Sequence, residues 1–108
     1  MDLPDAREKL SHGEPTWFAG AGRAFVMMAE HHHDDRVGFW AAAPEGVQHR
    51  LVAEDPGRYF VPPYVGGRGW VGVRLDVPDL DWDRVELVVQ DAFRTVASRT
   101  LRARLDPP

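Results

Sequence analysis

The segment from Tyr59 to Trp70, YFVPPYVGGRGW, combines four aromatic residues, two prolines, three glycines and one arginine in twelve residues. Pro62 and Pro63 fix the backbone and remove two amide donors, whereas the glycines permit a sharp bend and a close approach of the backbone. Aromatic faces, the Arg68 guanidinium and glycine N–H groups are together able to hold an anionic or planar ligand. The segment therefore predicts a binding lip with Tyr64 at its tip, or else a wide turn whose rings fold back onto the core.

Other groups of residues give weaker evidence for a metal, catalytic or phosphate-binding site. Three adjacent histidines, His31 to His33, invite a metal, but consecutive side chains diverge in a strand or loop, so we expect a solvated loop. Ser11 beside His12 lacks an acid to orient the imidazole, and Glu14 has no partner that completes a reaction site. The glycines are not followed by the Lys-Ser/Thr of a phosphate-binding loop, and the chain has no cysteine. We therefore expect no enzyme, no cofactor and no metal site.

The strand expected over Gly69 to Asp76 alternates between two kinds of side chain. Helices cover one face of such a sheet, so we expect the aliphatic set to lie under them. The other set, together with Trp40 of the strand expected over Val37 to Ala42, then forms an exposed aromatic floor that binds a ligand or a partner. The alternative is that a dimer mate, or Trp17 and the N-terminal segment, covers this floor. The aliphatic set is Val71, Val73 and Leu75, and the opposite set is Trp70, Gly72 and Arg74.

The whole chain of 108 residues predicts one α+β domain, residues 1–108. The expected order is α-β-β-β-α-β-β-α. Short connections favour an antiparallel five-stranded sheet with the helices on one face, in a two-layer sandwich. The expected helices are 5–11, 44–55 and a long last helix that begins at 81, and the expected strands are 14–18, 24–30, 37–42, 59–61 and 69–76.

The charge balance argues against broad binding to a phosphate backbone. Thirteen basic residues face seventeen acidic ones, for a net charge of −4. The region 92–105 differs from this average, because it carries four arginines and no acid. These arginines are able to meet nucleic-acid phosphates, or they simply complement the negative end of a solvated helix. They are Arg94, Arg99, Arg102 and Arg104.

No apolar run approaches the length that spans a membrane, and residues 1–12 are too charged for a signal peptide. We therefore expect a soluble cytoplasmic protein, monomeric or homodimeric, that does not associate with a membrane.

Four stretches together resemble a known family: SHGEPTWF (11–18), AFVMMAEHHHDDRVGFWAAAPEGVQHRL (24–51), DPGRYFVPPYVGGRGWVGVRLD (55–76) and DWDRVELVVQDAFRTVA (81–97). Their order and spacing are similar to the MmcQ/YjbR family of small bacterial proteins over nearly the whole chain. The resemblance implies a fold like that of the type III secretion chaperones and the frataxin-like CyaY proteins. It also implies DNA binding through a proposed double-wing surface, and it brings no catalytic motif.

The sequence thus predicts a non-enzymatic binding protein, with DNA as the ligand that the resemblance implies. In that case arginines contact phosphates while aromatic rings stack on bases. The alternative is a module that binds a small molecule, a peptide or a protein through the open sheet face and the Pro-Pro-Tyr/Gly-rich segment. The candidate phosphate contacts are Arg68, Arg74, Arg94 and Arg99, and the candidate stacking residues are Trp40, Tyr64 and Trp70.

Overall fold

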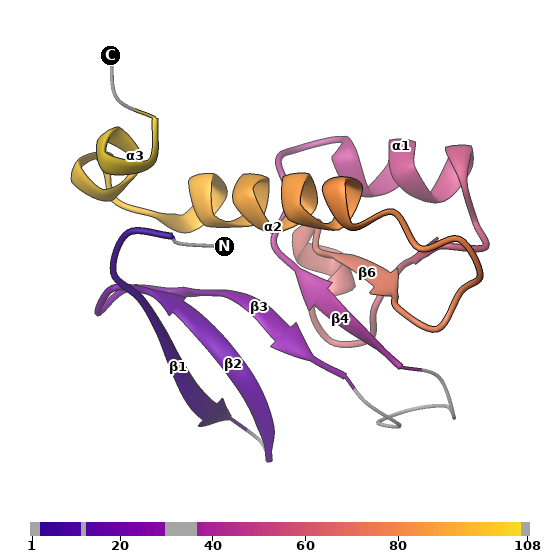
Figure 1. Ribbon diagram of the computed structural model, residues 1–108, viewed down its shortest axis with the longest axis horizontal. Helices are drawn as coiled ribbons and strands as arrows, with labels where there is room; N and C mark the ends of the chain where they lie inside the picture. Colours follow the sequence, from indigo (N-terminus) through magenta and orange to yellow (C-terminus); the bar gives the residue numbers. More distant parts are fainter. Residues whose placement is uncertain (1–2, 12, 30–36, 107–108) are drawn as a thin grey trace.

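The computed structural model of the chain describes residues 3–11, 13–29 and 37–106, so the expected loop at His31 to His33 lies outside the described residues. The described part holds a sheet with helices stacked above it (Figure 1). The strands are β1 (Ala6–Ser11), β2 (Glu14–Ala19), β3 (Ala24–Met28), β4 (Gly38–Ala41), β5 (Tyr59–Phe60) and β6 (Val71–Arg74). The helices are α1 (Val47–Glu54), α2 (Trp82–Val96) and α3 (Arg99–Leu105), with a 3₁₀ turn, η1, over Gly66–Arg68.

The expected α+β class and antiparallel sheet are confirmed. The described strands pair in the order β1-β2-β3-β4-β6-β5, and every pairing is antiparallel. The count of five strands is wrong, because the sheet has six. Both α1 and α2 lie on the face that carries Tyr59 and Val71, since all four contribute to one hollow between the helices and the sheet.

The sixth strand is the segment that the sequence predicted as a helix over residues 5–11. Those residues form β1, which pairs with β2 along its whole length from Ala6 opposite Ala19 to Ser11 opposite Glu14. Six residues are too few to sustain a helix alone, and the hairpin supplies the hydrogen bonds instead. Gly13 has φ 82° and lies in the connection between the two strands.

The expected long last helix is interrupted after Val96. Ala97 and Ser98 are extended, and the Ser98 hydroxyl accepts a hydrogen bond from the Leu101 amide at 3.2 Å, which caps a separate helix, α3. The break lets α3 turn back toward α2. Arg94 Nε and Nη2 then donate to the two carboxylate oxygens of Asp106 at 2.7 and 2.8 Å.

The core between α2 and the sheet depends on a bulge in β3. Trp17 pairs with Val26 but Phe18 pairs with Ala24, so Phe25 is one extra residue without a partner on β2. A bulge of this kind breaks the alternation of side chains. Phe25 and Val26 therefore both point toward α2, where the Phe25 ring meets Phe93 edge-on with 5.4 Å between centroids.

Replacement of Gly38 tests how closely the backbones of β4 and β6 approach each other. A Cβ at Gly38 would collide with the backbone carbonyl oxygen of Val73, which cannot rotate away as a side chain would. We expect Gly38→Ala to lower the free energy of unfolding by about 1–3 kcal/mol, measured by urea denaturation. Gly67→Ala is the control, because nothing lies within 4 Å of a Cβ there. Equal urea midpoints for the two variants would contradict the close β4–β6 contact.

Asp106 tests the attachment of α3. Asp106→Asn removes the carboxylate that holds Arg94, so we expect faster amide hydrogen exchange in α3 with little change in α2. The Arg94 hydrogen bonds lower the pKa of Asp106 below its ordinary value of 3.8. The stabilisation is therefore complete above pH 3.8 and is lost as pH falls through the lower pKa of the folded protein. The difference between variant and parent should disappear in strong acid, and a difference that persists there would rule out the ion pair as its cause.

Candidate functional site

The strand register assigns side chains to the two faces of the sheet. Residues directly opposite each other on neighbouring strands share a face. Met27 lies opposite Trp40, and Trp40 lies opposite Gly72. Val71 and Val73 point to the other face, where they are 0% and 3% exposed. The prediction that Trp40 and Gly72 share the face without helices is confirmed.

The prediction that the two tryptophans of this face are exposed is wrong. Trp40 is 7% exposed and Trp70 is 4% exposed. The reason is that residues 61–70 fold back over the sheet and cover both indoles. The Tyr64 ring lies 6.5 Å from the Trp40 ring at a tilt of 56°, and the Arg68 guanidinium lies 5.6 Å from the centre of the Trp70 ring.

Several backbone constraints hold this covering segment in place. Tyr64 has φ 63°, a left-handed conformation that is costly for a residue with a Cβ. Gly69, at φ 88°, ends the η1 turn without that cost. Gln48 of α1 donates its side-chain amide to the carbonyls of Gly66 and Trp70 at 2.8 and 2.6 Å. Helix α1 thus anchors both ends of the η1 turn, and Tyr64 projects from the segment with 79% of its surface exposed.

The segment leaves a hollow of about 520 Å³ between itself and the β1–β2 hairpin, which we call the helix-free hollow. Its floor is apolar and its rim is polar. Three of the sequence-predicted binding residues meet here, namely Trp40, Tyr64 and Arg68. The described lining residues are Ser11, Glu14, Met27, Met28, Trp40, Tyr64, Val65 and Arg68.

The rim of the helix-free hollow has opposite charges contributed by different elements. Arg68 comes from η1, and none of the described carboxylates forms an ion pair with it. Glu14 begins β2 and supplies a carboxylate from the hairpin. The hollow therefore presents an apolar floor, a cation and an anion to a ligand.

The other predicted site residues lie elsewhere. Trp70 is buried beneath Arg68, and the Arg74 guanidinium carbon lies 4.6 Å from the centre of the Phe60 ring, near the β5 edge of the sheet. Arg94 lies on α2, where its hydrogen bond to Asp106 raises the pKa of the guanidinium further and where it also pairs with Asp91. Arg99 is exposed at the start of α3. The seven predicted residues thus do not form one continuous surface.

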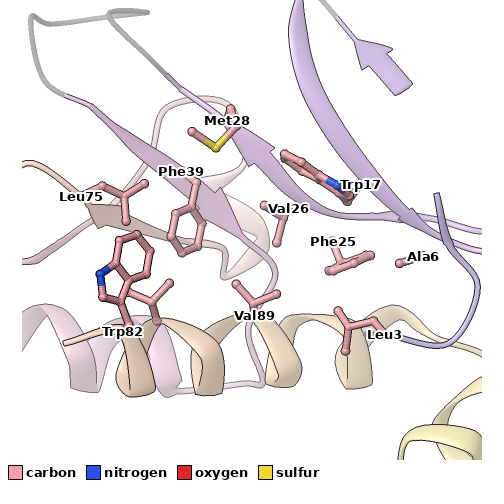
Figure 2. A pocket seen from close by; sticks show the side chains of 11 residues that line it. Leu3, Ala6, Trp17, Phe25, Val26, Met28, Phe39, Leu75, Trp82 and Val89 are labelled. Atoms are coloured by element: carbon pink, nitrogen blue, oxygen red, sulfur yellow. The ribbon is translucent and has the colours of Figure 1, made fainter. Parts of the chain in front are cut away.

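Sequence analysis missed a second hollow, of about 510 Å³, which lies between α2 and strands β1–β3 (Figure 2). We call it the helix-side hollow. The signal available in the sequence was the spacing of Trp82, Val85 and Val89, which places all three on one stripe of α2. In the structure Trp82 is 65% exposed. Its lining consists of Leu3, Ala6, Trp17, Phe25, Val26, Met28, Phe39, Leu75, Trp82, Val85 and Val89.

Comparison with known proteins gives one match. A protein-family model described as YjbR matches residues 1–95. No curated protein and no solved structure matches the chain. Within the described ranges, no helix has the length and apolar character needed to cross a membrane, and no three His, Cys, Asp or Glu side chains gather as a metal site would require.

Tyr64 tests the strain in the covering segment. Tyr64→Ala and Tyr64→Gly both remove the ring over Trp40, but only glycine adopts the left-handed backbone freely. We expect the glycine variant to be the more stable of the two by about 1 kcal/mol in urea denaturation. The same pair of changes at Val61, which has no positive φ, should give the opposite order. An alanine variant at position 64 as stable as the glycine variant would contradict the strained conformation.

Proposed function

The chain belongs to the YjbR family, and we propose that it is a non-enzymatic binding protein whose ligand is a small molecule held in the helix-free hollow. The observation that carries this proposal is the meeting of Trp40, Tyr64 and Arg68 around one hollow of about 520 Å³. That volume is typical of small-molecule sites, which combine an apolar lining with a few polar groups. Tyr64 and Arg68 belong to the covering segment, residues 61–70, which forms the lip of the site.

The rim and floor define the chemistry of the ligand. Met27, Met28 and Trp40 suit an aromatic or aliphatic body, since thioethers and indole rings pack well against flat apolar groups. Arg68 suits a carboxylate or phosphate through forked, charge-assisted hydrogen bonds. Glu14 suits an amine or hydroxyl donor at another point on the rim. The favoured ligand is therefore an aromatic carboxylate or phosphate that also carries a hydrogen-bond donor.

A binding role suits this lining better than a catalytic one. Ser11 supplies the only hydroxyl of the described lining apart from Tyr64, and no described imidazole or carboxylate forms a hydrogen bond with it. A serine without such a base is a weak nucleophile. Nothing in this lining calls for a metal or an organic cofactor to complete the ligand contacts.

DNA binding is the second candidate, and one observation favours it. Helix α3 exposes Arg99, Arg102 and Arg104, which form no ion pair with a described carboxylate. The same structure removes other expected contacts, because Arg94 is already paired with two acids and the indole of Trp40 is covered. A DNA-binding role would therefore depend on α3 rather than on the covering segment, so the two candidate functions depend on different residues.

Replacement of Arg68 tests the small-molecule proposal. The four tryptophans, labelled as 5-fluorotryptophan, give separate ¹⁹F NMR reporters. We expect titration with a panel of aromatic carboxylates, amino acids among them, to shift the Trp40 resonance. Arg68→Gln should weaken the best of these ligands about tenfold or more, because it removes a charged hydrogen-bond donor. Arg104→Gln, an exposed arginine of α3, is the matched control and should leave the affinity unchanged.

An oligonucleotide titration gives the opposing outcome. Binding at low salt that falls steeply with added salt, and that weakens with Arg104→Gln but not with Arg68→Gln, would favour DNA. Combined with an unshifted Trp40 resonance across the carboxylate panel, that result would overturn the small-molecule proposal.

A further inference from the structure

The helix-side hollow is a separate feature on the opposite face of the sheet. Figure 2 shows Trp82, Phe39 and Leu75 together at one end and Leu3, Ala6 and Phe25 together at the other. All of its described lining residues are apolar, and its volume of about 510 Å³ lies within the range of ligand sites. The side chains of the described chain thus leave a sizeable apolar space open beneath α2.

Aromatic rings from four different elements line this space. Trp17 lies on β2, Phe25 on β3, Phe39 on β4 and Trp82 on α2. The faces of aromatic rings attract cations, and indole does so most strongly. Trp82 is both part of the lining and 65% exposed, so its ring is accessible at the open edge of the hollow.

The charges beside the aromatic lining are acidic. Glu8 lies directly opposite Trp17 in the β1–β2 ladder and so shares its face. Glu86 lies one helical turn after Trp82 on α2 and is held there by a hydrogen bond from Gln90 at 3.4 Å. Among the described basic residues near this region, Lys9 faces the Phe18 ring on the helix-free side and Arg84 lines the hollow between α1 and α2. Arg58 forms an ion pair with Asp55 and donates to the Asp79 carbonyl at 3.3 Å.

The connection that leads into α2 adds to this negative charge. It runs from Leu75 to Trp82, both of which line the hollow, and it contains no basic residue. An apolar ligand with a positive charge would therefore find apolar surface, aromatic faces and a negative potential together. The acids of this connection are Asp76, Asp79 and Asp81.

We propose that the helix-side hollow binds a lipophilic organic cation. The apolar body of the ligand occupies the space beneath α2, and its ammonium or comparable cationic centre lies against Trp82 beside Glu86, while Glu8 adds negative charge beside Trp17. This site is distinct from the helix-free hollow and goes beyond the small-molecule function proposed for it, because the two sites lie on opposite faces and select opposite charges.

A pair of probes with the same shape and opposite charge tests the proposal. Tetraphenylphosphonium is the cation and tetraphenylborate the matched anion. In the 5-fluorotryptophan protein we expect tetraphenylphosphonium to shift the Trp17 and Trp82 resonances and to leave Trp40 unshifted. Tetraphenylborate should bind at least about tenfold more weakly, since it meets the same surface with the unfavourable charge.

Matched variants separate the contributions of ring and charge. Trp82→Ala should weaken the binding of tetraphenylphosphonium about tenfold. Leu87→Ala should not, because Leu87 is an apolar residue of similar exposure on another side of α2. The pair Glu8→Gln and Glu86→Gln should reduce the preference for the cation severalfold. The pair Glu45→Gln and Glu54→Gln changes the net charge equally at exposed positions of another region and should leave the preference intact.

Three outcomes would overturn the proposal. One is equal affinity for the two probes, which would mean an apolar surface without charge selection. Another is loss of the preference in both glutamate pairs alike, which would assign it to net charge. The third is a concentration-dependent dimer that Trp82→Ala dissociates and that excludes both probes, since the hollow would then be occupied by a second copy of the chain. All three outcomes describe the helix-side hollow, which is followed through Trp17 and Trp82. None of them affects the Trp40 and Arg68 tests of the helix-free hollow.

Discussion

One extra residue in β3 determines how α2 packs on the sheet and where the hollow beside it lies. Because Phe25 has no partner on β2, two consecutive side chains point toward α2, and Phe25 reaches Phe93 while Val26 keeps its place in the sheet. A bulge also bends and twists its strand. The β1–β2 hairpin that continues from β3 diverges from α2 as a wing (Figure 1). The helix-side hollow lies in the angle between this wing and α2, so the contact that fastens the helix also accounts for the space beside it.

On the face without helices, an uncovered sheet would expose two tryptophans, Trp40 and Trp70, to water. The chain covers them with its own residues 61–70 and needs no partner for this. Prolines restrict the backbone of the segment, α1 anchors it through Gln48, and Tyr64 adopts a left-handed backbone that brings its ring to 6.5 Å from the Trp40 ring. The cover is incomplete, and the part left open is the helix-free hollow. One segment thus acts both as a structural brace and as the lip of a candidate site.

The sequence predicted the elements whose burial is decided by near neighbours. Alternation in β6 identified its buried valines, and Pro44 together with Pro56 and Gly57 bracketed α1. Prediction from the sequence failed where the local structure depends on residues far apart in the chain. AREKLS suits a helix or a strand, and only pairing with β2 selects the strand. The burial of Trp40 depends on residues far along the chain, such as Tyr64. Ser98 is compatible with a continuous helix, and only the structure shows that its hydroxyl caps a separate helix, α3.

The extent of the family match bears on where a shared activity would reside. Residues 1–95 include the whole sheet, α1 and nearly all of α2, and every residue that lines either hollow falls within them. The exposed arginines of α3 fall beyond that limit. An activity common to the family would therefore depend on the sheet, α1, α2 or the two hollows rather than on α3. Net charge is a poor guide to such an activity, because Glu8 and Glu86 lie on the helix side of the sheet while Arg68 lies on the opposite face, and a total of −4 averages over both.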